Sequence, residues 1–162
     1  MPSIFHENMA GKVGDKIIKW LGAIETGLLG TVDSTKKRTE EVASSISSSL
    51  AARVKCDEPR DDQLEPDLSY THDDSSTAGL VVEVAWSQSN LKLPFRATRY
   101  IVEGTNGKIR TVVGFNMNNI YRGGNRATFS IWKAQLVDNK WSRIATVEGQ
   151  VRFWEDYVLL IL

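Results

Sequence analysis

The amino-acid sequence predicts one α/β domain, because the period of its hydrophobic residues changes along the chain. In residues 8–29 the apolar residues recur every three or four positions, which is typical of an amphipathic helix. After residue 66 they alternate or form short β-branched runs between turns, and a helical stretch at residues 91–103 interrupts these runs. The order helix, strands, helix, strands predicts helices packed on a β-sheet rather than a doubly wound dinucleotide-binding fold. A chain of 162 residues is long enough to bury the core of one such domain.

The first third of the chain carries weaker patterns. Lys12, Lys16 and Lys19 gather on one side of the helix expected at residues 8–29. A second helical pattern runs through the serine-rich residues 40–53, although serine side chains compete for backbone hydrogen bonds and so disfavour a helix there. Residues 57–66 are polar and contain two prolines, which predicts a loop.

The expected strands occupy the rest of the chain. Residues 79–86 are nearly all apolar and β-branched, which is typical of a central strand that is covered on both faces. The helix at residues 91–103 has Pro94 in its first turn, a position where proline is tolerated. Further strands are expected at residues 67–72, 109–116, 127–137 and 141–153, with a last apolar strand at residues 157–162.

The composition excludes several kinds of site. Cys56 is the only cysteine and the sequence has two histidines, so neither an intrachain disulfide nor a zinc site of the Cys/His type can form. Any metal must therefore bind to oxygen ligands. The sequence also lacks the glycine-rich motifs of dinucleotide-binding and phosphate-loop proteins.

The sequence shows no sign of a membrane or secretory segment. No apolar run approaches the roughly 20 residues that span a bilayer. The first residues lack a basic region followed by an apolar stretch. We therefore expect an intracellular protein, cytoplasmic or nuclear.

The net charge of zero conceals two halves of opposite charge. Residues 1–78 contain 9 basic and 14 acidic residues, whereas residues 79–162 contain 11 basic and 6 acidic residues. From Lys92 to Arg143, ten basic residues are accompanied by two acidic residues. Such an excess predicts contact with the phosphates of DNA or RNA. The alternative is that these residues form the ordinary solvated faces of strands and a helix.

Two acidic residues stand out by their positions. Glu83 lies within the apolar central strand, on the side shared by Val81 and Ala85, and Asp67 begins the preceding strand. A charged carboxylate inside an apolar strand costs several kcal/mol unless a cation or an accessible cleft accompanies it. Two carboxylates that converge on adjacent strands suit a Mg²⁺ or Mn²⁺ ion. The alternative is that Glu83 pairs with an arginine of the following helix and that Asp67 caps a turn.

These residues lie in segments that resemble the PD-(D/E)XK nuclease superfamily, in particular bacterial restriction endonuclease-like proteins and related uncharacterised fungal proteins. The resemblance covers residues 60–118 and rests on the segments 66–70, 80–88, 96–101 and 109–114. It implies that residues 1–162 form a restriction endonuclease-like domain, which is an α/β fold with a central mixed β-sheet flanked by helices. It also implies that Asp67 and Glu83 bind the divalent metal, Mg²⁺ or Mn²⁺, of a nuclease.

The chain departs from the family motif at one position. The family's lysine, two residues after the glutamate, corresponds to Ala85, which can neither orient a water molecule nor stabilise developing charge. Arg96 and Arg99 in the following helix are candidates for an electrostatic clamp on phosphate, because arginine does not act as a base at neutral pH. Gln88, just after the central strand, is a candidate for orienting a water molecule.

Two functions therefore remain open. The first is a metal-dependent phosphodiesterase or nuclease acting on DNA or RNA, with the catalytic residues Asp67, Glu83, Gln88, Arg96 and Arg99. The second is a noncatalytic module of the same fold, in which an arginine neutralises Glu83 and the basic strands bind a nucleic acid or an acidic protein. Metal dependence distinguishes them, because only the first predicts that Mg²⁺ or Mn²⁺ stabilises the fold.

Overall fold

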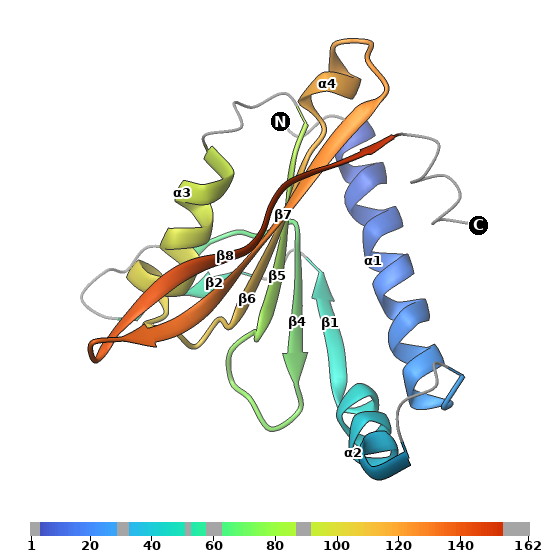
Figure 1. Cartoon of the computed structure of the whole chain (residues 1–162), viewed down its shortest axis with the longest axis vertical. Coiled ribbons are helices and arrows are strands. Elements are labelled where there is room, and N and C mark those ends of the chain that lie inside the picture. The colour runs from blue at the N-terminus through green and yellow to red at the C-terminus, as the bar shows by residue number, and fades with distance from the viewer. Residues whose placement is uncertain (1–3, 29–32, 51–52, 58–62, 87–91, 154–162) are drawn as a thin grey trace.

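A computed structural model describes residues 4–28, 33–50, 53–57, 63–86 and 92–153 of the chain. They form a mixed six-stranded β-sheet with helices on both of its sides, so the predicted α/β class with a mixed sheet is confirmed. Figure 1 shows two of the flanking helices, α1 and α3, on opposite sides of the strands.

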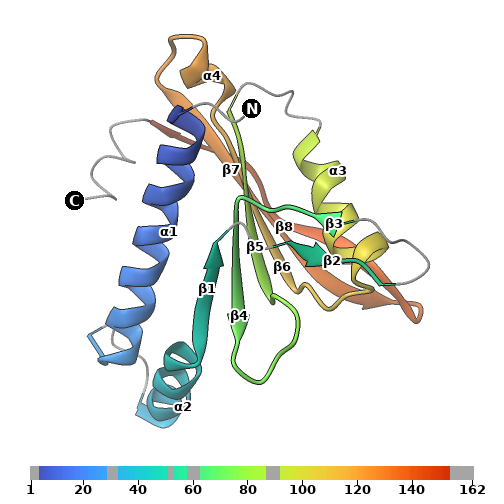
Figure 2. The same cartoon turned by 180° about the vertical axis from the view of Figure 1, so that it is seen from behind.

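The main sheet has the strand order β1-β4-β5-β6-β7-β8. All neighbouring pairs are antiparallel except β5 and β6, which run parallel and are joined by a helical crossover. A separate antiparallel pair, β2 and β3, lies between β4 and α3 in Figure 2. The strands are β1 (Ile46–Leu50), β2 (Val54–Lys55), β3 (Gln63–Leu64), β4 (Leu68–His72), β5 (Leu80–Ala85), β6 (Thr111–Asn116), β7 (Arg126–Val137) and β8 (Lys140–Phe153).

The helices differ in length and in regularity. The crossover from β5 to β6 consists of α3 (Lys92–Thr98), which continues into a π-helical turn, η1 (Arg99–Gly104). The other helices are α1 (Ile4–Glu25), α2 (Asp33–Ser44) and the short α4 (Asn118–Tyr121). None of the helices in the described part of the chain is both long and apolar enough to cross a membrane.

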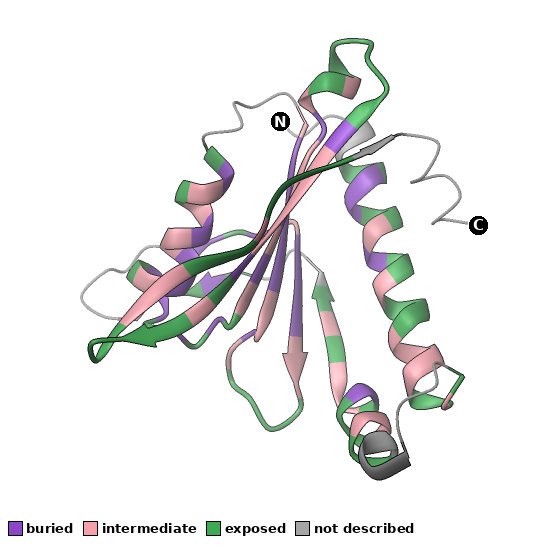
Figure 3. Cartoon of the chain, viewed as in Figure 1, coloured by how far each residue is buried: buried purple, intermediate pink, exposed green. Residues whose placement is uncertain are grey.

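The sheet is buried on both sides along its central strands, as Figure 3 shows. On one side, Val82 of β5 packs in a cluster with partly buried residues of α1. On the other side, Val81 of β5 packs with residues of α3 and η1 and with Trp132 of β7. Every residue of β5 after Leu80 is buried, which confirms the prediction of a central strand covered on both faces.

The first helix was predicted at residues 8–29 and lies slightly earlier, at Ile4–Glu25. Its end is set by Gly27, which has a φ of +70° that glycine adopts without steric cost. The backbone N–H of Leu28 donates to the carbonyl oxygen of Ala23 at 2.9 Å, which completes a Schellman turn.

The serine-rich segment is the larger correction. A helix was predicted at residues 40–53, but α2 ends at Ser44 and β1 begins at Ile46. Ser47 lies opposite Thr71 in the antiparallel pairing of β1 with β4. Pairing with β4 provides hydrogen-bond partners for the backbone N–H and C=O groups of this segment. Because serine is also a poor helix former, a strand forms here in place of the expected helix.

The loop predicted at residues 57–66 is also corrected, because it contains β3, which pairs with β2. The remaining predicted strands agree with the structure to within about two residues, as does the helix predicted at residues 91–103. The last strand predicted at residues 157–162 lies outside the described residues, as does Gln88.

Candidate functional site

Asp67 and Glu83 lie at neighbouring positions on adjacent strands. In the register of β4 and β5, Leu68 is opposite Val82, so Asp67 immediately before β4 comes level with Glu83. The Oδ2 atom of Asp67 accepts a hydrogen bond from the backbone N–H of Val84 at 2.6 Å. The Asp67 carboxylate is therefore held against β5 beside Glu83, which is the convergence that the sequence predicts.

Glu83 is a buried carboxylate with two polar partners. The residue is 1% exposed, and it lies on the α3 side of the sheet. The Nη2 atom of Arg96 lies 2.9 Å from Glu83 Oε1, and the Tyr100 hydroxyl donates to the same oxygen at 2.5 Å. The cost of burying this carboxylate is thus partly offset by one cation and one hydrogen bond.

The local environment changes the proton affinity of Glu83. Burial raises the pKa of Glu83 to about 8, and the nearby negative charge of Asp67 acts in the same direction. The positive charge of Arg96 and the hydrogen bond from Tyr100 lower the pKa of Glu83 but do not cancel the effect of burial. Burial also raises the pKa of Tyr100, and the charge of Glu83 adds to this shift, so its hydroxyl stays protonated as a donor.

The crossover helix positions both partners of Glu83. Arg96 in α3 and Tyr100 in η1 are four residues apart, which places them on one side of a helical turn. The guanidinium of Arg96 also donates to the backbone carbonyl of Glu65 at 3.0 Å, so it bridges the sheet and the segment that precedes β4. The Arg96 side chain is 35% exposed, so it connects the buried carboxylate to the surface.

A cavity of about 460 Å³ opens beside this arginine. Lys92, Arg96 and Arg99 line it, as do Phe95 and Tyr100. Phe95 is 59% exposed, although it is a large apolar side chain. The basic residues that the sequence predicts as phosphate clamps thus line one cavity, whose wall includes the ion-pair partner of Glu83.

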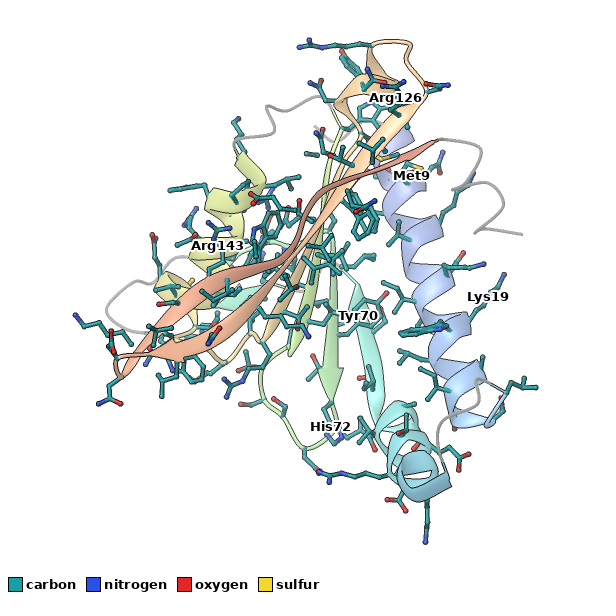
Figure 4. All side chains as sticks on the ribbon, viewed as in Figure 1. Met9, Lys19, Tyr70, His72, Arg126 and Arg143 are labelled. Carbon is teal, nitrogen blue, oxygen red and sulfur yellow. The ribbon has the colours of Figure 1, made fainter. Side chains whose placement is uncertain are left out.

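The rest of the basic region does not gather at this cavity. Figure 4 shows Arg126 near α4 and Arg143 on the hairpin of β7 and β8, well apart from each other. Lys108 lies 2.7 Å from Asp57 in an ion pair, and the Arg110 guanidinium lies 4.4 Å from the ring centroid of Trp141. Several of these basic residues thus have structural partners, and the charge from Lys92 to Arg143 does not form one continuous surface.

The structure adds Tyr100 to the residues that the sequence singles out, and its spacing of four residues from Arg96 is the signal that points to it. Ala85, at the position of the family's lysine, is buried at 4% exposure. Within the described residues, no group of three or more acidic, histidine or cysteine side chains is arranged to hold a metal ion.

Comparison with protein-family models, with curated proteins and with solved structures finds no match to this chain.

Proposed function

We propose that Asp67 and Glu83 form the metal-binding centre of a PD-(D/E)XK-type phosphodiesterase that acts on DNA or RNA. The observation that carries this proposal is the anchoring of the Asp67 carboxylate on the backbone of β5, next to Glu83. The arrangement of an antiparallel pair, a helical crossover and a parallel strand supports a restriction endonuclease-like fold around these carboxylates. The place of action in this proposal is intracellular, cytoplasmic or nuclear, as expected from the sequence.

The two carboxylates fit a Mg²⁺ or Mn²⁺ ion in their chemistry. Magnesium commonly binds to one or two carboxylates and completes its coordination with water and substrate phosphate oxygens. Once bound, such an ion lowers the pKa of a coordinated water molecule and orients the phosphodiester. In this proposal Asp67 and Glu83 are the protein ligands of the ion.

The remaining residues of the site bind and orient the substrate in this proposal. Arg96 and Arg99 supply positive charge to the phosphate, since Ala85 cannot replace the family's lysine. Lys92 at the same cavity adds a third positive charge. Gln88 keeps its proposed role of orienting a water molecule.

A noncatalytic module is the second candidate, and a specific contact favours it. Glu83 already has two partners within the protein, the ion pair with Arg96 and the hydrogen bond from Tyr100. In this alternative the cavity beside Arg96 binds nucleic acid or an acidic protein, and the Asp67–Glu83 pair binds no metal.

A metal titration followed by thermal unfolding separates the two candidates. The wild type is compared with Glu83→Gln and with the control Glu148→Gln, which alters an exposed residue of β8. If the pair binds metal, Mg²⁺ or Mn²⁺ at about 100 times its Kd stabilises the wild type and the control by about 2.7 kcal/mol. Glu83→Gln should lose this response, because the amide removes one anionic ligand.

The proposed activity then requires cleavage of a labelled DNA or RNA strand by the wild type but not by Glu83→Gln. An equal thermal response in all three proteins would show that the metal binds elsewhere. The absence of any response at millimolar metal would overturn the phosphodiesterase and leave the noncatalytic module.

A further inference from the structure

A second cavity, of about 500 Å³, opens beside β1 and β4. Its walls carry hydroxyl groups from both strands and two basic side chains. These residues are Ser47, Ser49, Arg53, Lys55, Ser69 and Thr71, and the acidic residue Asp73 also lines the cavity.

The hydroxyl cavity lies on the same side of the sheet as the candidate metal site. Side chains alternate along a strand, so Asp67, Ser69 and Thr71 face one side of β4. Ser69 is opposite Val81, which precedes Glu83 by two residues on β5. Two residues of a strand span about 6.6 Å, so the cavity begins about that distance from the Asp67–Glu83 pair.

The β2–β3 pair separates the hydroxyl cavity from the basic cavity that Lys92, Arg96 and Arg99 line. Arg53 reaches Glu65 with its Nε atom 2.7 Å from Oε1, while Arg96 donates to the backbone carbonyl of the same glutamate. Glu65 thus contacts one arginine from each cavity. Asp67 follows Glu65 by two residues in the chain, so the Asp67–Glu83 pair lies between the hydroxyl cavity and the basic cavity.

We infer that the hydroxyl cavity binds the sugar–phosphate group of the nucleotide next to the phosphodiester at Asp67 and Glu83. Serine and threonine hydroxyls donate to phosphate and sugar oxygens, and Lys55 supplies positive charge, whereas Arg53 is paired with Glu65. A single strand of nucleic acid then crosses the site from this cavity to the basic cavity, where Phe95 stacks on an unpaired base. The inference rests on the proposed function, because it takes nucleic acid as the substrate.

Binding of a fluorescein-labelled single strand of mixed sequence, followed by anisotropy in metal-free buffer, tests the inference. The affinity is measured between about 50 and 200 mM salt for the wild type, Lys55→Ser, Ser49→Asp and the control Lys19→Ser. Lys19 is exposed on α1, the helix that covers the other side of the sheet. All four proteins must unfold at similar temperatures, which is expected because the three substituted residues are exposed.

The expected effects differ among the variants. Lys55→Ser should reduce the magnitude of the salt slope by about 0.7, the value for one phosphate contact with a single strand. Ser49→Asp should weaken binding about tenfold or more, because it places a negative charge against the phosphate. Lys19→Ser should leave the slope unchanged. An unlabelled duplex of the same sequence should compete less well than the unlabelled single strand.

Several results would overturn the inference. They are the absence of binding by the wild type, an equal slope for Lys55→Ser and Lys19→Ser, or equal competition by the duplex. The thermal response to Mg²⁺ is measured on the same proteins. If that response persists while the slopes are equal, the cavity assignment fails and the phosphodiesterase stands. If the slope falls as expected while the wild type shows no metal response, the cavity assignment stands and the phosphodiesterase fails.

Discussion

Adjacent residues of β5 face two interiors of different chemistry. Val82 and Val84 face α1, where they pack among apolar side chains. Glu83 between them faces α3 and is fully buried, yet it carries a carboxylate. The α1 side of β5 is therefore stabilised by apolar packing, whereas the α3 side must also accommodate a buried polar group.

The difference lies in what each helix offers to the strand. Arg96 of α3 and Tyr100 of η1 give the Glu83 carboxylate a cation and a hydrogen-bond donor. The part of α1 that faces Val82 contributes Val13, Ile17 and Leu21. A central strand can thus hold a functional carboxylate on one face, provided that the helix covering that face carries its partners.

The largest expected effect comes from placing a further carboxylate one residue away from Glu83, on the α1 side. Val82→Asp places an acidic group at a position of 0% exposure, among apolar neighbours. We expect a loss of about 4 kcal/mol or more in the free energy of unfolding, measured by denaturant titration. Val82→Ala is the control for lost volume and should cost about 2 kcal/mol. Equal losses in the two variants would show that the α1 side accommodates a carboxylate as well as the α3 side does.

A smaller effect is expected when the arginine on the α3 side is removed. At pH 9, Arg96→Met removes the positive charge that lowers the pKa of Glu83, so the buried carboxylate must either stay ionised with only Tyr100 as its partner or take up a proton. We expect the free energy of unfolding to fall by about 3 kcal/mol, whereas adding Glu83→Gln to Arg96→Met should recover part of the loss. Lys92→Met alters an exposed residue of the same helix and should change the stability by less than about 0.5 kcal/mol. Additive effects of the Arg96 and Glu83 substitutions would contradict a coupled pair.

Much of this contrast could be predicted from the sequence, because strand alternation is a strong local signal. The alternation assigns Val81, Glu83 and Ala85 to one face and Val82 to the other, and the structure agrees. The alternative that an arginine of the next helix pairs with Glu83 is also borne out, by Arg96. These features depend on residues that are close in sequence or on one regular element.

Features that depend on distant pairing could not be predicted in this way. The second half of the helix expected at residues 40–53 is instead the strand β1, whose backbone hydrogen bonds are made with β4. The serine-rich sequence of this segment does not show that β4 is its partner. The two-residue strands β2 and β3 are too short to show a period. The role of Glu65 between the two cavities follows from that pairing, so it too required the structure.

A further expected effect is a dependence of stability on pH that the α3 side has and a neutral variant lacks. The pKa of Glu83 rises from 4.5 in the unfolded chain to about 8 in the folded protein, because the carboxylate is buried. The folded state then binds its proton more tightly than the unfolded state does. The contribution of Glu83 to stability is therefore fully present below about pH 4.5 and is lost as the pH rises through about 8.

The comparison that isolates this effect is the free energy of unfolding of the wild type minus that of Glu83→Gln, measured in metal-free buffer from pH 4 to pH 9. One proton corresponds to at most about 1.4 kcal/mol per pH unit, so the difference should fall with a slope of that size between the two pKa values. Groups that titrate equally in both proteins cancel in the difference. A difference that stays flat across the window would mean that Arg96 and Tyr100 fully offset the burial of the carboxylate. A difference that increases with pH would mean that they stabilise the ionised form beyond its stability in water, and Glu83 would then stay ionised in the folded protein without a metal.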